Sequence, residues 1–569
     1  MFRMSDFRIH VAVLILALLH FLVNLQSVFP LPFQLNVADE PIHSNLGRML
    51  LNSLSENRTP YLVPQALNPL VALFYAFIYV PLHQYTHWML ASLWIGHALI
   101  FSLLWLGTYL VARQVRQFCH PLIIVGFLFI TPVVPMLLER STDGLYAAII
   151  LFALWQTSCY YHSRRIHHVF TAGALLGLAA LTRNDGLALF PAFLLASGLV
   201  SIQGTRRWGR VRRLAVPLLA ATIPYAALVG GYIAVVGFTT GFWGTGGQGL
   251  SYMAFEQSEG MAYSSDSAGY LSGITEARAR YGTSEENRGS IVNAVLRNPG
   301  AYLLRVAAVI LRAPLIAASA YGGLWSLIVL PFSFAGAIWL ARNGERRLLA
   351  VYLLWMAPLS IYLLFYYREP YFLFPFPVVL LLAGIGLTWA LSCLRGLSYP
   401  FNPPRIQRLA APLLICVLLI AQIPKIADGP LQIPRIGQTG EEQTIEYLVE
   451  HYPRETRVAS FVGFVPWAAK MHFEFSFVEW MGITSGDELR EWVKRNDIEL
   501  VYVDRLLRFY APQVYELFDA GVGSQFREVS TIEDQSPERV RTYKEVVEAG
   551  VVALDNLQWW SHRLLEVLR

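Results

Sequence analysis

The chain has 569 residues, of which 55% are hydrophobic and 15% are charged. Soluble domains carry about 25% charged residues, so this composition excludes a soluble globular protein and predicts an integral membrane protein. The formal net charge of +5 comes from short arginine clusters between apolar runs, which is no sign of a nucleic-acid partner. We therefore expect the chain to sit in a lipid bilayer and to bind no nucleic acid.

The apolar runs predict a multi-pass helical protein. A helix needs about 20 apolar residues to cross a bilayer, and the runs predict about 11 such spans. The first run is interpreted as a retained span, since no A-x-A-like cleavage site follows it. The runs begin near residues 9, 87, 121, 143, 168, 186, 214, 321, 348, 371 and 409.

The connections between the runs predict the orientation in the membrane. One set is basic ("ARQVRQ", "HSRRIHH", "GTRRWGRVRR", "ARNGERR"), and the other is acidic or aromatic ("ADEPIH", "ERSTDG", "TRND", "YYREPY"). The positive-inside rule places the basic set, and Met1 with it, in the cytoplasm. The sequence therefore predicts a plasma (inner) membrane protein whose chain after Ala427 is extracytoplasmic.

Two apolar stretches do not fit the pattern of spans. Residues 66–82 are short and broken by prolines, so we expect an interfacial or re-entrant segment on the outer face. Residues 301–315 have an amphipathic pattern and are predicted to lie on the outer leaflet, with Arg305 and Arg312 turned to lipid headgroups. Residues 30–86 and 240–320 are therefore expected to be outer loops of a transmembrane domain that covers residues 1–427.

Residues 428–569 predict a soluble, extracytoplasmic domain. "RVASFVGF", "HFEFSFVEW" and "IELVYVD" have the composition of strands, and "SGDELREWVKRN" and "RLLRFYAPQVYELF" have that of amphipathic helices. Alternating strands and helices favour an α/β domain with a mostly parallel sheet. Its single glycine in "FVGFVP" does not make a phosphate-binding loop, so we expect an accessory role.

Carboxylates gather at the predicted outer ends of the spans. Asp39 and Glu40 follow the first span in "ADEPIH", and Asp143 opens the fourth in "STDGLYAAII". Charged groups near the hydrocarbon boundary are costly unless they are paired or hydrated. Two acidic clusters on one face therefore predict a polar cavity at the outer surface. The alternative is that these are solvated residues that end helices.

These motifs, taken in order, resemble the GT-C superfamily of glycosyltransferases. The segments are "ADEPIHSNL", "LNPLVALFY", "STDGLYAAIILFAL", "LTRNDGLALFPAFLL" and "YREPYFLFPFPVVLLLAGIGL". The chain is similar in particular to the branch of the protein O-mannosyltransferases and the lipid A aminoarabinose transferase. The resemblance covers residues 9–427 and implies a GT-C type membrane fold.

The resemblance implies an inverting transfer of a sugar, mannose-like or another hexose or pentose. The donor is an undecaprenyl- or dolichyl-phosphate sugar, and the acceptor is a hydroxyl of an extracytoplasmic glycan, lipid or protein. Asp39 takes the role of general base, and Glu40 and Asp143 orient the acceptor or hold a cation. The departing phosphate needs positive charge. The candidates for it are Arg48, Arg183, Arg368 and His43.

No cofactor is implied, although a divalent cation is left open, and the histidines and cysteines show no metal-ligand spacing. Aromatic side chains in the long outer loop could form a lid that stacks on a sugar; the alternative is an ordered cap that contacts no ligand. These sugar or acceptor candidates are Trp243, Tyr252 and Phe255, with Tyr371 from the "YREPY" segment.

Two other functions compete with glycosyl transfer. A lipid-linked-glycan transporter or flippase would hold its polar site near the bilayer midplane, whereas the ionisable residues here gather at the outer ends of the spans. A non-catalytic cell-envelope scaffold would act through the C-terminal domain.

Overall fold

The structure is a computed structural model of the whole chain, and some parts of it are not described below. It describes residues 6–28, 69–79, 88–138, 141–201, 207–240, 243, 252, 255–256, 258–259, 276–283, 286–288, 290–356, 364, 369–397, 440–453, 456–460, 465–466, 469, 472–475, 485–503, 512–533 and 561–568. The candidate site residues Asp39, Glu40, His43, Arg48 and Arg368 lie outside the described residues.

Each predicted span that begins between residues 9 and 371 corresponds to a helix, and the one near residue 409 lies outside the described part. The helices before residue 240 are α1 (Asp6–Val23), α2 (Leu25–Val28), α4 (Pro69–Tyr79), α5 (Trp88–Gln114), α6 (Pro121–Ile130), α7 (Val133–Leu138), α8 (Ser141–Ser163), α9 (Ile166–Thr182), α10 (Gly186–Ser201) and α11 (Arg207–Thr240). The later ones are α14 (Ile291–Arg297), α15 (Pro299–Ala320), η2 (Gly323–Trp325), α16 (Ser326–Arg342), α17 (Arg346–Met356), η3 (Glu369–Leu373) and α19 (Phe376–Leu397).

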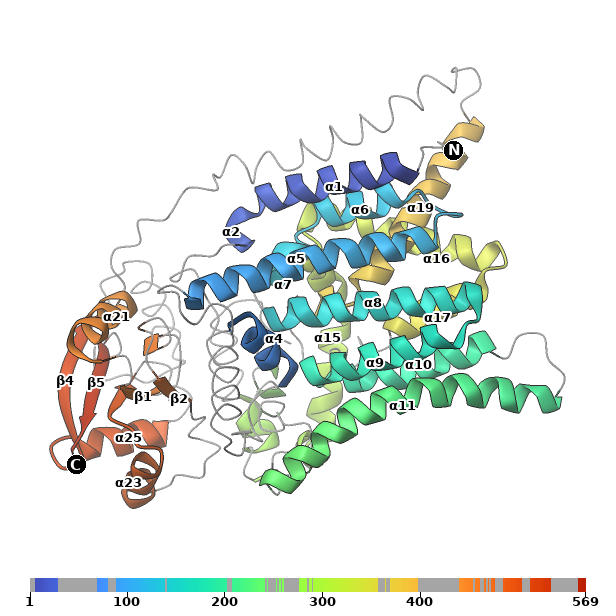
Figure 1. Cartoon of the computed structure of the whole chain (residues 1–569). Coiled ribbons are helices and arrows are strands. Elements are labelled where there is room, and N and C mark those ends of the chain that lie inside the picture. The colour runs from blue at the N-terminus through green and yellow to red at the C-terminus, as the bar shows by residue number, and fades with distance from the viewer. Residues whose placement is uncertain are drawn as a thin grey trace.

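Most of these helices lie side by side in one bundle (Figure 1). Helix α8 is buried along most of its length between α5 and α9, as expected for a helix that is apolar all round. Helix α11 instead exposes large apolar side chains, among them Leu219 (60%), Ile223 (62%) and Phe238 (82%). Such a surface is typical of a face turned to lipid.

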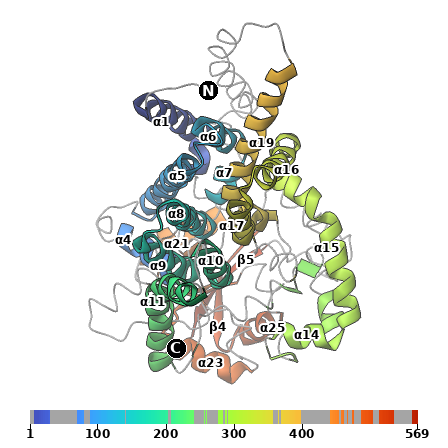
Figure 2. The same ribbon diagram turned by 90° about the vertical axis from the view of Figure 1, so that its right-hand side faces the viewer.

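Four helices of the described part are long and apolar enough to cross a membrane: Trp94–Gln114, Leu214–Phe238, Pro299–Ala320 and Phe376–Cys393. The third of these, α15, is arranged differently from the others. Figures 1 and 2 show α15 running across the bundle helices rather than along them. This orientation agrees with the sequence prediction of a helix that lies on the bilayer surface.

The C-terminal domain lies beyond the end of the bundle at which α5 and α8 begin (Figure 1). Its helices are α21 (Gly440–His451), α23 (Gly486–Arg495) and α25 (Pro512–Gly521). Its strands are β1 (Arg457–Ser460), β2 (His472–Phe475), β3 (Leu500–Val503), β4 (Phe526–Glu533) and β5 (Ser561–Val567). Helix α23 begins with a capping box between Ser485 and Glu488, which satisfies amides that the helix start leaves unpaired.

The sheet has the strand order β2-β1-β3-β5-β4. Strand β1 pairs in parallel with β2 and β3, whereas β5 is antiparallel to β3 and to β4. The prediction of a mostly parallel sheet is therefore wrong. The sheet is mixed, because β4 and β5, which follow the predicted strands in the sequence, add two antiparallel pairings. Apolar side chains of α23 pack on one face of the sheet and Leu448 of α21 packs on the other, so helices cover both faces, as in α/β folds.

Candidate functional site

Asp143 is a buried carboxylate in the first turn of α8. Its residue is 1% exposed, and the partial positive charge of the helix N-terminus favours an anion there. The next residue, Gly144, allows α7 to approach closely, since a Cβ at this position would meet the carbonyl oxygen of Leu137 at 2.8 Å. The start of α8, which bears the carboxylate, therefore packs closely against the end of α7.

Arg183 binds this carboxylate from the turn between α9 and α10. It is the C-cap residue of α9, and its Nη1 forms an ion pair with Oδ1 of Asp143. Its Nε donates a hydrogen bond to Oδ2 of Asp185 at 2.9 Å. Gly186 holds this turn against α9, because a Cβ there would meet the backbone of Ala180. One guanidinium thus binds two carboxylates, one from the first turn of α8 and one from its own α9–α10 turn.

Three aromatic rings surround the guanidinium of Arg183. Its Cζ lies 5.1 Å from the ring centroids of Tyr371 and Phe374 and 6.0 Å from that of Tyr146. Tyr146 meets Phe374 edge to face at 4.9 Å. A cation within about 6 Å of a ring face is attracted to it. Helix α8, the α9–α10 turn and η3 therefore meet at one point.

The second oxygen of Asp143 is the chemically notable atom of this site. Asp143 Oδ2 is buried and has no hydrogen-bond partner in the described part of the chain. Buried acceptors are almost always paired, so this oxygen is suited to accept a hydrogen bond from a ligand or to bind a cation. Among the described residues, no group of three or more His, Cys, Asp or Glu side chains could hold a metal ion.

The structure brings together some of the predicted site residues and separates others. Asp143, Arg183 and Tyr371 meet, whereas Trp243 is 59% exposed and contacts Phe238 at the end of α11. Sequence reasoning missed three participants: Tyr146, Asp185 and Phe374. Tyr146 could have been found, because it lies three residues after Asp143 and hence on the same face of α8.

Tyr252 and Phe255 are fully buried in a separate cluster with Tyr281 and Ala294. The hydroxyl of Tyr252 donates to the carbonyl oxygen of Gly282 at 2.7 Å and accepts from Asn287 at 2.8 Å. This is the packing expected of an ordered cap, which was the alternative to a sugar-stacking lid. We refer to the described residues between 252 and 297 as the cap.

A buried ion cluster joins the cap to α15. Glu259 binds Arg280 at 2.7 Å and Arg305 at 3.3 Å, and the side chains of Glu259 and Arg305 are 0% and 1% exposed. The expectation that Arg305 turns to headgroups is therefore wrong. It binds Glu259 and Ser258 and lies over the ring of Phe255, while Leu304 and Leu311 of α15 are exposed.

Burial changes the acid–base behaviour of the cap. Loss of water raises the pKa of Glu259 above its ordinary value, although Arg305 and Arg280 oppose this change. Burial likewise raises the pKa of Glu256, against the hydrogen bond from Arg278. Helix α15 also packs against η3, the element that bears Tyr371. The cap is thereby linked to the Arg183 site through α15.

No protein-family model and no curated protein matches the chain, but solved structures do. The oligosaccharyltransferase AglB from Archaeoglobus fulgidus, in complex with an inhibitory peptide and a dolichol-phosphate, has a TM-score of 0.52 at 12% identity over 99% of this chain and 89% of its own. An Archaeoglobus fulgidus oligosaccharyltransferase in the apo form has a TM-score of 0.52 at 14% identity over 95% of this chain and 81% of its own. ArnT from Cupriavidus metallidurans, bound to undecaprenyl phosphate, has a TM-score of 0.50 at 14% identity over 99% of this chain and 98% of its own.

Both neighbours are polyprenyl-phosphate-dependent glycosyltransferases of the GT-C superfamily. At these identities the likeness concerns the fold, and it extends over nearly the whole of the chain. The predicted resemblance is thus confirmed: the chain has the polytopic fold of the GT-C glycosyltransferases.

Proposed function

We propose that this protein is a membrane glycosyltransferase that moves a sugar from a polyprenyl-phosphate carrier to a hydroxyl of an acceptor outside the cytoplasm. The observation that carries the proposal is the buried Asp143, held by Arg183 at one end of the bundle with one oxygen left to bind a ligand. The GT-C fold supports it, because neighbours with that fold bind dolichol-phosphate or undecaprenyl phosphate.

The proposed orientation puts this end of the bundle and the C-terminal domain on the extracytoplasmic side. It rests on the basic connections at the other ends of the helices, which the positive-inside rule assigns to the cytoplasm. The position of the C-terminal domain beyond the end where α8 begins (Figure 1) agrees with this orientation. About 11 spans remain the proposed topology, with the α/β domain positioning the acceptor.

In the proposed reaction, Asp39 takes the proton of the acceptor hydroxyl while the sugar leaves its phosphate with inversion. Glu40 and Asp143 orient the acceptor or hold a divalent cation. Positive charge stabilises the departing phosphate, and the proposed donors of that charge are Arg48, Arg183, Arg368 and His43. Arg183 also binds Asp143, so it would link the residues that orient the acceptor to those that bind the phosphate. Tyr371 would border the sugar or the acceptor.

The test is a transfer assay with purified full-length protein and a panel of polyprenyl-phosphate sugars. We expect one donor to be turned over and Asp39→Asn to lower the rate about 10²–10⁴-fold, as loss of a general base does, with little change in donor binding. Glu40→Gln should reduce the rate less. Wild-type turnover by Asp39→Asn would contradict the base assignment. Movement of the intact lipid-linked glycan across a vesicle membrane without transfer would favour a flippase.

A further inference from the structure

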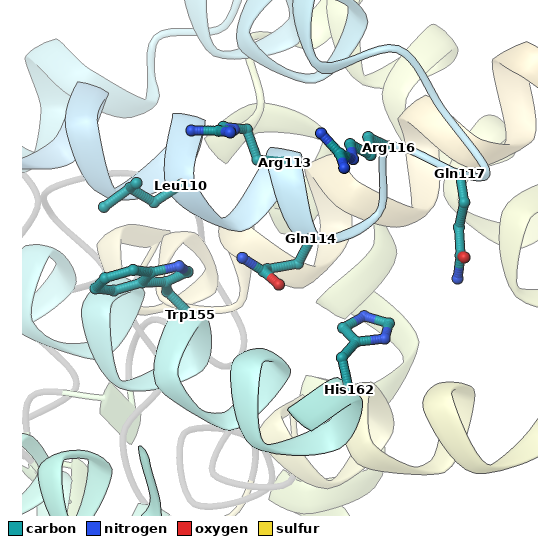
Figure 3. A pocket seen from close by; sticks show the side chains of 7 residues that line it. All are labelled: Leu110, Arg113, Gln114, Arg116, Gln117, Trp155 and His162. Carbon is teal, nitrogen blue, oxygen red and sulfur yellow. The ribbon is translucent and has the colours of Figure 1, made fainter. Parts of the chain in front are cut away.

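A cavity of about 440 Å³ lies at the end of α8 opposite Asp143, and Figure 3 shows the side chains that line it. Asp143 is in the first turn of α8 and His162 is in the last. Nineteen residues of helix at 1.5 Å each separate the two by about 28 Å, close to the thickness of a bilayer core. The cavity is lined by Leu110, Arg113 and Gln114 of α5, by Arg116 and Gln117 after it, and by Trp155 and His162 of α8.

The lining favours an anion with several oxygen atoms. Among the described residues, two guanidinium groups line the cavity and no carboxylate does. Two glutamine amides and an imidazole add further hydrogen-bond donors. Figure 3 shows Gln114 on one helix and His162 on the helix that faces it. Glu345, on the α16–α17 turn, accepts a hydrogen bond from Tyr161 at 3.3 Å rather than lining the cavity. Guanidinium forks match the geometry of phosphate oxygens.

An apolar path leads from the cavity along α5 toward the middle of the bilayer. Leu110 lines the cavity, and the exposed Leu106, Leu99 and Ile95 (49%, 44% and 41%) lie within about 60° of one another around the helix, at about 100° per residue. Trp155 forms the opposite wall, and Trp is typical of the membrane–water interface. A ligand with both a phosphate and an acyl chain matches both features: its phosphate fits the cavity, and its acyl chain fits the stripe of apolar side chains along α5.

We propose that the cavity binds the phosphate headgroup of an anionic phospholipid in the leaflet opposite the transfer site. Basic pockets between membrane helices on the cytoplasmic side bind such headgroups in other proteins. The lipid would bridge the end of α5 and the end of α8, and its chain would follow the Leu110–Leu106–Leu99 stripe. The proposal does not depend on the transfer reaction.

The experiment measures thermal stability of the delipidated full-length protein as dioleoyl phosphatidylglycerol is added. Ligands that bind only the folded state raise the melting temperature. We expect phosphatidylglycerol to raise it for the wild type, and phosphatidylcholine or inorganic phosphate to have little effect. The double variant Arg113→Gln/Arg116→Gln should bind phosphatidylglycerol at least about tenfold more weakly, since hydrogen bonds to charged groups are lost.

The matched control is Arg165→Gln/Arg342→Gln, which removes the same charge from two exposed residues that do not line the cavity. It should keep wild-type binding of phosphatidylglycerol. Equal stabilisation by phosphatidylcholine, or equal loss in both double variants, would overturn a specific headgroup site. Stabilisation by inorganic phosphate alone would instead identify a soluble anion as the ligand and overturn the lipid.

A measurement on the wild type covers the case in which the double variant does not fold. Phosphatidylglycerol with a photoreactive group on its headgroup is crosslinked to the protein, and the adducts are mapped by mass spectrometry. We expect adducts within residues 110–117 and 155–162. Adducts spread evenly over the helix ends, or confined to other helices, would overturn the proposal.

Discussion

Arg183 and Asp143 lie 40 positions apart in the sequence, and their side chains form an ion pair at one end of the helix bundle. The Asp143 side chain is 2% exposed and that of Arg183 is 17% exposed, so water cannot easily replace either partner. Removing one partner of such a pair leaves a buried charge without compensation. The pair therefore contributes to both the fold and the proposed site.

Arg183→Met should lower the free energy of unfolding by about 3–5 kcal/mol, the cost typical of breaking a buried pair from one side. The double variant Arg183→Met/Asp143→Asn should recover part of this loss, because the more deeply buried carboxylate is then neutral and only Asp185, whose side chain is 13% exposed, loses its charged partner. Denaturant unfolding in detergent micelles measures both. Arg165→Met, at an exposed position, is the control and should change stability by no more than about 0.5 kcal/mol. An Arg183→Met protein as stable as wild type would show that the pair is not formed.

Asp143→Asn tests the oxygen that the protein leaves unpaired. The variant keeps the shape of the side chain and removes its charge. If Asp143 orients the acceptor, kcat/KM for the acceptor should fall about tenfold, less than the 10²–10⁴-fold typical of losing a base, while donor affinity stays the same. Asp185→Asn is the matched control, because Asp185 binds the same guanidinium through a different nitrogen. An equal loss in both variants would assign Asp143 to holding Arg183 rather than the acceptor.

Tyr371 tests the aromatic contact with Arg183. Tyr371→Phe keeps a ring at the position that lies 5.1 Å from the guanidinium, whereas Tyr371→Leu removes it. Desolvated cation–π contacts are worth about 2 kcal/mol, so the leucine variant should be less stable by about that amount, and the phenylalanine variant should resemble wild type in stability. Thermal unfolding checks both. Loss of transfer in a stable Tyr371→Phe would indicate that the hydroxyl contacts substrate.

Part of this site could be predicted from the sequence for a physical reason. Asp143 opens one helix and Arg183 ends the next, and consecutive helices joined by a short loop run antiparallel. Their outer ends must therefore meet, which is what the alternating loops predicted. The contact with Phe374 could not be predicted, because it depends on how η3 packs against α8, and no periodic pattern records such a contact between distant segments.

The environment of Arg305 and the conformation of β5 could not be predicted from the hydrophobic pattern of the sequence. An amphipathic helix predicts that its arginines face water, but Arg305 is paired with Glu259, a residue outside α15 that the pattern of α15 cannot reveal. In the C-terminal domain, "SHRLLEV" forms β5 although its two adjacent leucines do not alternate with polar residues as a half-buried strand would. Its pairing with β3 and β4 determines its conformation, and that pairing joins segments far apart in the sequence.

The cap should become less stable as pH rises. Burial holds the pKa of Glu259 above its ordinary value of 4.5, so the folded cap binds this proton more tightly than the unfolded chain does. The stabilisation from that proton is complete below pH 4.5 and is lost as pH rises through the pKa of the folded state. Glu256 acts in the same direction. Amide hydrogen exchange in α14 and residues 276–283, expressed as protection factors, should show lower protection at about pH 8 than at about pH 5.

Two variants, each replacing a glutamate with neutral glutamine, separate the contribution of Glu259 from that of its neighbours. Glu259→Gln removes the buried titrating group, so protection should depend less on pH. Glu286→Gln is the control: the backbone amide of Thr283 and the guanidinium of Arg297 lower the pKa of Glu286, so the stabilisation from its ionised form is complete above pH 4.5 and is lost only at lower pH. Removing it should lower protection equally at both pH values and leave the loss of protection with rising pH unchanged. A wild-type pH dependence in Glu259→Gln would show that this carboxylate does not titrate with the opening of the cap.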